Sequence, residues 1–188
     1  MSTSEAQLIQ IVESAYIADT ARLFGKITIG EGSSVWFGAV MRAECDEIVI
    51  GHNTNIQDQC VVHVGFGKPT VIGDYCSVTH HATIHGATIG DNCLVGIGAV
   101  VMDGAVIGEN SIVAGNAFVP EGREFPPNSL IAGTPAKLVK EIDARLANRT
   151  NAWVYAENAQ GYRQGDHRVW SSEAFLGKVE QAYTDLAR

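Results

Sequence analysis

Three histidines lie within one short stretch, SVTHHATIHG, of a chain that has six in all. They are His80, His81 and His85, and a fourth, His63, ends the stretch NIQDQCVVH upstream. Neutral imidazole is a common ligand for zinc and related metals, and three such ligands leave zinc a free position for water, which is the catalytic pattern. Whether these side chains converge depends on the elements that carry them.

Aliphatic residues recur at a period that identifies those elements. Apolar residues recur about every 3.6 positions in a helix and every 2 positions in a half-buried strand, whereas here the aliphatic residues recur every six positions. That period favours a β-helix of hexapeptide repeats, in which three short strands form each triangular coil, over a β-sandwich with irregular turns. Hexapeptide repeats are known in the left-handed form, although spacing alone does not fix handedness. The series runs Ile17, Leu23, Ile29, Val35, Met41, Ile50, Ile56, Val62, Ile72, Val78, Ile84, Ile89, Val95, Val101, Ile107, Val113 and Val119.

The repeat defines the expected domain organisation. We predict an all-β solenoid, a left-handed parallel β-helix, over residues 11–135, and a helical segment packed on it over residues 136–188. Leu138, Ile142 and Leu146 recur at helical spacing, as do hydrophobic residues from Phe175 onward.

Composition excludes several classes of function. The net charge is −8 without clustered Lys or Arg, which argues against nucleic-acid binding. The N-terminal stretch MSTSEAQLIQIVESAY does not resemble a secretory signal, and no apolar run reaches membrane-spanning length. We therefore expect a cytoplasmic protein without membrane contact.

The four cysteines follow the same hexad frame. Cys45, Cys60, Cys76 and Cys93 each lie four residues after an aliphatic position, and none forms a CxxC pair. We expect all four to point inward as small hydrophobic residues, and none to act as nucleophile or ligand.

The frame also predicts which histidines meet. Three hexads make one coil, so Ile84 lies one coil above Val62 once the VGFGKPT loop is allowed for. His85 then stacks on His63, with Arg42 beneath. Neighbouring strands are about 4.8 Å apart, so two stacked imidazoles can share one metal.

His80 lies two residues after Val78, and therefore near another edge of the triangle. If it completes the site, it must come from a neighbouring subunit, and a threefold assembly would bring these edges together. Gln57 is expected in the column of His80. The other histidines, His52, His81 and His167, are expected to have no role.

Together, NIQDQCVVHV, VTHHATIHGATIGDNCLVGIGAVVMDGAVIGENSIV and LIAGTPAKLVKEI resemble the gamma-class carbonic anhydrase-like family, and within it the branch of phenylacetate- and carnitine-pathway accessory proteins. The resemblance covers roughly residues 11–165. It implies a homotrimer with a metal, usually zinc, between subunits, and a salt bridge between subunits from Arg42 and Asp58. The implied ligands are His63, His80 and His85, with Arg42, Asn55, Gln57 and Asp58 around them.

Three departures from the family pattern predict slow or latent turnover. Arg42-Ala43-Glu44 stands where many members have Arg-x-Asp, and GFGKPT replaces an acidic loop that carries a proton-transferring glutamate. A tyrosine common in the family near the later turn is also absent, and Ile131 lies there instead.

The expected activity is that of a lyase, the reversible hydration of CO2 to bicarbonate by metal-bound hydroxide. Zn2+ is the expected metal, and Fe2+ or Co2+ would also suit three histidines. Gln57 is expected to orient the hydroxide or polarise CO2 with support from Asn55, and Glu44 to accept a proton. The alternatives are a hexapeptide acyltransferase, a metal-dependent acyl-CoA thioesterase and a non-catalytic trimer stabilised by metal.

Overall fold

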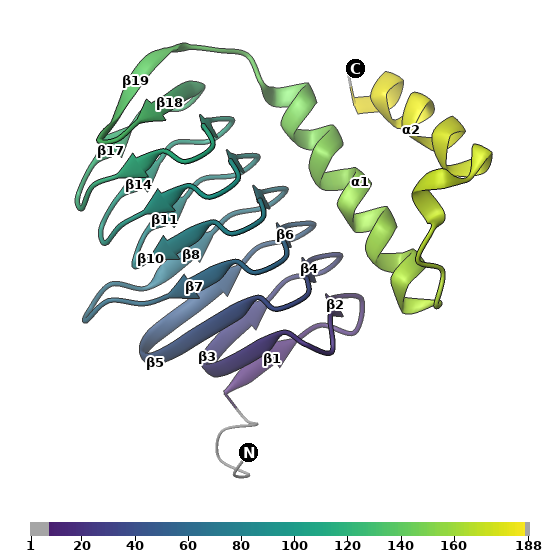
Figure 1. Cartoon of the computed structure of the whole chain (residues 1–188), viewed down its shortest axis with the longest axis horizontal. Coiled ribbons are helices and arrows are strands. Elements are labelled where there is room, and N and C mark those ends of the chain that lie inside the picture. The colour runs from purple at the N-terminus through teal and green to yellow at the C-terminus, as the bar shows by residue number, and fades with distance from the viewer. Residues whose placement is uncertain (1–7, 187–188) are drawn as a thin grey trace.

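The computed structural model describes residues 8–186, which form a left-handed parallel β-helix followed by a helical part (Figure 1). Residues 1–7, part of the stretch searched for a secretory signal, lie outside the described residues. The hexad repeat explains this fold, because each hexad presents one aliphatic side chain to the axis of the coil. Val62, Val78 and Ile84 are fully buried there.

The strands form two hydrogen-bonded sheets. The larger sheet contains β1 (Ile9–Ile11), β3 (Arg22–Ile29), β5 (Val40–Ile50), β7 (Val61–His63), β8 (Thr70–Ile72), β10 (Thr83–His85), β11 (Thr88–Ile89), β13 (Val100–Val101), β14 (Val106–Ile107), β16 (Phe118–Val119) and β17 (Glu124–Phe125). The smaller sheet contains β2 (Tyr16–Ile17), β4 (Ser34–Val35), β6 (Asn55–Ile56), β9 (Ser77–Val78), β12 (Leu94–Val95), β15 (Ile112–Val113), β18 (Ser129–Gly133) and β19 (Ala136–Glu141).

The larger sheet covers two sides of the triangular coil, because β5 bends round a corner. The start of β5 pairs with β7, and its end pairs with β8. The first face therefore contains the start of β5 with β7, β10, β13 and β16, and the second face contains the end of β5 with β8, β11, β14 and β17. The smaller sheet is the third face.

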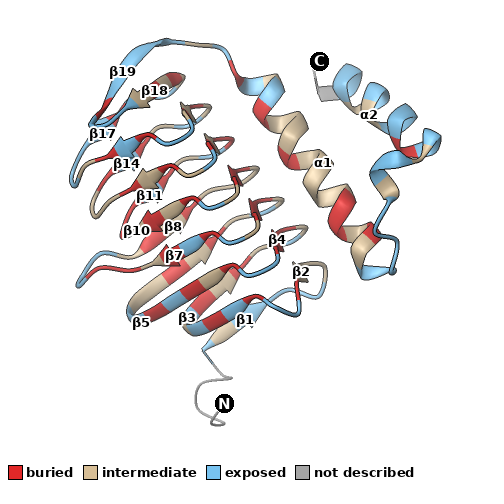
Figure 2. Ribbon diagram, viewed as in Figure 1, coloured by how far each residue is buried: buried red, intermediate tan, exposed pale blue. Residues whose placement is uncertain are grey.

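Buried residues alternate with exposed ones along the coils, as the buried segments of the ribbon show (Figure 2). The predicted aliphatic positions line one continuous core. Three of the four cysteines, Cys60, Cys76 and Cys93, lie in it as expected.

The expectation for Cys45 is wrong, because its thiol is exposed. Ala43 pairs with Gly25, whereas the next paired residue on β5 is Glu47, opposite Lys26. The intervening residues bulge out of the coil, so a position four after Met41 no longer faces the axis.

The start of the predicted helical segment also differs. Residues 136–141 form β19, which runs antiparallel to β18 at the end of the stack. Helix α1 begins only at Arg145 and extends to Arg163, and it is followed by a short 3-10 turn, Val169–Ser171, and helix α2, Glu173–Leu186. The division into domains 11–135 and 136–188 stays a prediction.

Helix α1 packs along the third face, against β2, β4, β6 and β9, while α2 lies on its outer side (Figure 1). The polar side chain of Asn148 anchors it, donating to the carbonyls of Asn92 at 2.9 Å and Ser111 at 3.2 Å. Within residues 8–186, no helix combines the length and the apolar composition needed to cross a membrane.

Candidate metal centre

Arg42, His63 and His85 stack on successive strands of the first face, as the hexad frame predicted. Residue 42 on β5 pairs with residue 63 on β7, which pairs with residue 85 on β10. The two imidazole rings lie 4.7 Å apart between centroids, and His63 Nδ1 faces His85 Nε2 at 2.9 Å. Two ring nitrogens therefore converge on one point of the surface.

Carboxylates hold the outer nitrogens of this pair. His63 Nε2 lies 3.2 Å from Glu44 Oε2, and Glu44 also forms an ion pair with Arg42. Asp103 forms a short hydrogen bond to His85 Nδ1. A carboxylate on the second nitrogen of a metal-binding histidine fixes the tautomer and the orientation of the ring.

Asp103 is a residue that the sequence reasoning missed. It lies 18 residues after His85, but the five-residue step from Ile84 to Ile89 shortens this coil to 17, so the hexad count places Met102 level with His85 and Asp103 one residue further on. Glu44 is thus one of two carboxylates beside the histidine pair.

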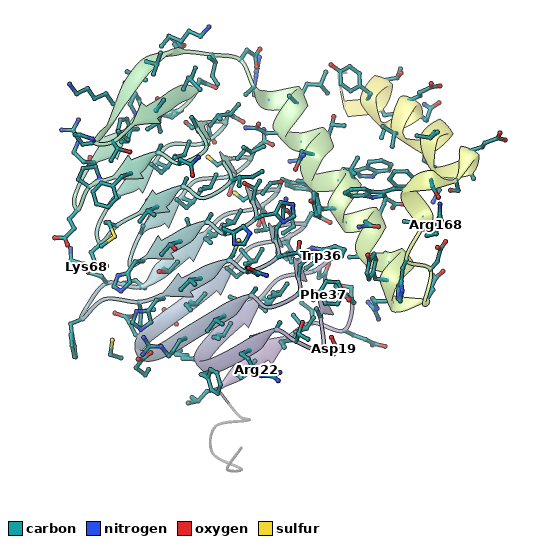
Figure 3. All side chains as sticks on the ribbon, in the orientation of Figure 1. Asp19, Arg22, Trp36, Phe37, Lys68 and Arg168 are labelled. Carbon is teal, nitrogen blue, oxygen red and sulfur yellow. The ribbon has the colours of Figure 1, made fainter. Side chains whose placement is uncertain are left out.

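His80 lies at the opposite end of β10, in the turn that enters the first face from the smaller sheet. Its Nδ1 is 3.0 Å from Asp58 Oδ2. Figure 3 shows that the two ends of the first face lie on opposite sides of the coil. Lys68, in the loop after β7, lies on one side, and Phe37 lies on the other. Phe37 shares the column of Asp58 and His80, as the backbone bonds from Gln59 to Phe37 and from His81 to Asp58 establish.

The predicted column of Gln57 and His80 is wrong by one residue. Asp58 and His80 each follow a hexad aliphatic by two positions, whereas Gln57 follows Ile56 directly and lies level with Thr79. Gln57 is 2% exposed, beneath helix α1, and its Nε2 donates to Asn55 Oδ1 at 2.9 Å.

The structure of one chain thus contains two separate groups. The first, called the histidine pair, contains His63 and His85 together with their partners Arg42, Glu44 and Asp103. The second, the His80 group, comprises Asp58 and His80, and the hydrogen-bonded pair Asn55 and Gln57 precedes Asp58 along the chain. Within residues 8–186 of a single chain, no set of three His, Cys, Asp or Glu side chains is placed to hold a metal ion. Arg42 and Asp58 belong to different groups and do not pair within the chain.

The donor chemistry of both groups nevertheless fits a zinc-like ion. His80 and His85 each have Nδ1 bound to a carboxylate, which leaves Nε2 free to coordinate. Ligand nitrogens on a tetrahedral zinc are roughly 3.3 Å apart for bonds of about 2.0 Å. The 2.9 Å between His63 Nδ1 and His85 Nε2 needs only a small opening to reach that value.

Electrostatics favour the neutral form of His63. Partial burial lowers the pKa of its imidazole, and the charge of Arg42 and the neighbouring His85 ring lower it further. Only the neutral ring offers a lone pair to a metal.

The side chains of the remaining histidines take no part in either group. His52 accepts a hydrogen bond from the backbone N–H of Glu31 at 3.1 Å, and His167 stacks on Tyr162. His81 is exposed in a turn with φ of 60°, so its side chain diverges from that of its neighbour His80.

Comparisons with known proteins agree with this fold. Residues 86–121 match the family described as bacterial transferase hexapeptide (six repeats). A carbonic anhydrase of Geobacillus kaustophilus is 41% identical over 157 residues, covering 82% of this chain and 86% of that protein. The gamma carbonic anhydrase 2 of Arabidopsis thaliana, a mitochondrial protein, is 43% identical over 97 residues, covering 48% of this chain and 35% of its own length.

A crystal structure of a hexapeptide transferase family protein from Anaplasma phagocytophilum superposes with a TM-score of 0.79 at 36% identity, covering 82% of this chain and 92% of that one. The matched part spans 57% of the length of one curated relative and 35% of the length of two others. The match to the Geobacillus protein extends over most of both chains. This chain therefore belongs to the gamma-class carbonic anhydrase-like family of hexapeptide-repeat proteins.

Proposed function

We propose that this protein catalyses the reversible hydration of CO2 at a metal ion held between the subunits of a homotrimer. The observation that carries the proposal is the division of the histidines between the two ends of β10. Within residues 8–186, no third ligand completes the histidine pair, and His80, held by Asp58 through Nδ1, has only the diverging side chain of His81 as a histidine neighbour in sequence. In a cyclic assembly, the edge of one chain that carries His63 and His85 would lie against the edge of the next chain that carries His80. This contact would complete the ligand set.

Exposed apolar side chains beside His80 support a subunit contact there. Phe37 is 37% exposed and Ile97 is 55% exposed, and both belong to the column of His80. Apolar surface of this kind next to a polar site is typical of an interface that assembly buries. The same contact would bring Arg42 near Asp58 of the neighbouring chain.

His63, His85 and the partner subunit's His80 would hold the metal, for which Zn2+ is the first candidate and Fe2+ and Co2+ are others. A bound ion would supply Lewis-acid activation of water near neutral pH. Asp103 and Asp58 would fix the orientation of two of the ligand rings, and the lowered pKa of His63 would keep that ring neutral.

The chain's other residues would position the reactants and move the proton. Gln57, held by Asn55, would direct an amide group at the bound substrate. Glu44 combines a contact to His63 with a side chain that is 48% exposed, so it could pass a proton from the site to solvent. Arg42 would hold Glu44 through their ion pair.

Acyl-CoA chemistry is the second candidate, as transfer or as metal-dependent thioester hydrolysis. The description of the matching repeat family and the transferase name of the Anaplasma relative favour it. Acyl transfer needs one histidine as general base. It would leave the facing nitrogens of His63 and His85 without a purpose, and we therefore place it second.

Stopped-flow CO2 hydration tests the proposal on protein loaded separately with Zn2+, Fe2+ and Co2+ under anaerobic conditions. We expect hydration above the rate of a matched His63→Ala variant for at least one metal. A panel of CoA thioesters assayed in parallel would identify the second candidate if it is turned over while CO2 is not. Metal bound without either activity would indicate that the ion only stabilises the assembly.

A further inference from the structure

A chain of hydrogen bonds links Gln57 to helix α1. Gln57 Nε2 donates to Asn55 Oδ1 at 2.9 Å, and Asn55 Nδ2 donates to Ser77 Oγ at 3.0 Å. Ser77 Oγ in turn donates to Asn151 Oδ1 on α1 at 2.8 Å. Asn55, Gln57 and Ser77 are each no more than 2% exposed. We call this series of hydrogen bonds, from Gln57 to Asn151, the amide relay.

The orientation of the Asn55 amide in the amide relay follows from its surroundings. Asn55 Nδ2 also faces the carbonyl of Cys76 at 3.2 Å, and a carbonyl can only accept. The NH2 group of Asn55 must therefore lie on that side, which turns its oxygen toward Gln57. Ser77 has one hydroxyl proton, and an acceptor at Asn151 lets the hydroxyl donate there while it accepts from Asn55.

If Asn151 presented no acceptor, the hydroxyl of Ser77 would be free to rotate, and a buried donor would be left unpaired. An unpaired buried polar group costs about 1–3 kcal/mol, so the network would rearrange to avoid it. Asn151 thus stabilises, through Ser77, the same orientation of Asn55 that the Cys76 carbonyl favours, and that orientation commits Nε2 of Gln57. With Nε2 committed to Asn55, Gln57 can offer its carbonyl oxygen and its second N–H to a ligand.

We infer that Asn151 is a positioning residue for the candidate centre. It acts through Ser77 and Asn55 to fix which groups Gln57 presents, and this role rests on the proposed function. Helix α1 then serves the site as well as the fold. The competing interpretation is that Asn151 only docks the helix on the third face.

Asn148 provides the control that separates the two interpretations. It lies one turn earlier on α1 and also anchors the helix, but its amide binds backbone carbonyls outside the amide relay. Asn151→Leu and Asn148→Leu remove comparable polar anchors at similar volume. Asn151→Asp keeps an oxygen acceptor for Ser77, and Ser77→Ala interrupts the relay at its centre.

The first measurement uses metal-free, 15N-labelled protein and follows the side-chain NH2 resonances of Gln57 and Asn55. In Asn151→Leu and in Ser77→Ala we expect both resonances to shift and their hydrogen exchange to rise about tenfold or more. Asn151→Asp should restore the native values, and Asn148→Leu should leave both resonances in place while lowering the urea midpoint.

The second measurement is CO2 hydration by the metal-loaded variants. Loss of an outer hydrogen-bond partner at a metal site typically costs 10–100-fold, and we expect a loss of roughly that size in kcat, with KM and metal content unchanged, for Asn151→Leu. Asn151→Asp should recover most of it.

Unchanged Gln57 and Asn55 resonances in Asn151→Leu would overturn the inference. Equal changes in Asn148→Leu would overturn it as well, since they would follow from helix docking alone. If the wild-type protein hydrates no CO2, the proposed function fails, while the resonances still decide whether Asn151 orients Gln57.

Discussion

At the scale of single residues, His80 and His85 share one arrangement although they lie at opposite ends of β10. Each has Nδ1 against an aspartate, Asp58 in one case and Asp103 in the other. The aspartate keeps Nδ1 protonated and turns Nε2 outward. Two independent aspartate–histidine pairs in one chain are better explained by a shared ligand than by solvated surface histidines.

The substitution Asp103→Asn tests this arrangement. A neutral amide at this position would attract the Nδ1 proton of His85 less strongly than the carboxylate does, so we expect metal affinity to fall roughly 10–100-fold with little change in stability. Competition with a chromophoric chelator measures the affinity. Asp91→Asn is the control, because Asp91 accepts a backbone N–H from Asp74 in a turn of another corner. An equal loss in both variants would contradict the role of Asp103.

The buried thiol of Cys60 gives the folded protein a characteristic pH dependence. Burial raises the pKa of Cys60 from 9.0 to about 12. The folded state therefore binds more protons than the unfolded state between these values, and stability falls as the pH rises above 9. Burial raises the pKa of Tyr155 to about 12 as well, which acts in the same direction at higher pH.

We expect the free energy of unfolding in urea to decline between pH 8.5 and 10.5 less steeply in Cys60→Ala than in the wild type. Metal content at neutral pH should be the same in both, because the thiol lies in the core. Parallel pH profiles would show that the Cys60 thiol ionises as easily in the folded state as in the unfolded state.

At the scale of elements, the hexad period predicted the strands of the coil and the residues that face the core. It also aligned His63 with His85 across an inserted loop, because the phase resumes at Ile72. The errors arose where backbone geometry departs from counting. The bulge after Ala43 exposes Cys45, and nothing in the residue types of that segment marks it.

The strand at residues 136–141 shows a second limit of spacing arguments. Leu138 and Ile142 are four positions apart, which matches one face of a helix, but four is also an even number and matches one face of a strand. The antiparallel pairing with β18 decided between them. The column of Asp58 and His80 could be read from the sequence, and the same count corrects the placement of Gln57, which follows Ile56 by one residue whereas His80 follows Val78 by two.

Tight contact between coils makes some glycines indispensable to the stack. A Cβ added at Gly90 would lie 2.7 Å from the backbone nitrogen of Glu109 in the next coil, whereas one at Gly177 in α2 would meet open space. We expect Gly90→Ala to cost about 3 kcal/mol, the upper range for overpacking. Gly177→Ala should gain about 0.5–1 kcal/mol from helix propensity. Urea titration of both variants measures the difference, and similar costs would contradict close packing at Gly90.

At the scale of the whole molecule, the separation of the two histidine groups predicts complementation between inactive chains. His63→Ala and His80→Ala should each lack properly coordinated metal when purified alone. In a mixed trimer, the His80→Ala chain still offers His63 and His85, and the His63→Ala chain still offers His80. Cyclic symmetry then provides one interface with a complete ligand set.

Co-expression with two different tags and metal analysis of the doubly tagged species measures this. We expect metal, and any CO2 hydration, to return in part. Doubly tagged trimers without metal would contradict ligands from two chains. His81→Ala, an exposed neighbour of His80, is the control and should retain full metal content on its own.

The antiparallel strand β19 has a consequence for how copies of the whole molecule can associate end to end. The last coil of a parallel stack displays unpaired N–H and C=O groups on which the first coil of another copy could continue, and repetition of that step would build a filament. On the smaller sheet, β19 occupies this edge and reverses the chain direction, with Lys137, Lys140 and Glu141 exposed along it. Charged residues on an edge strand oppose pairing with another chain. The turn before β19 and the six residues of this strand thus prevent another copy of the chain from adding further coils on that face.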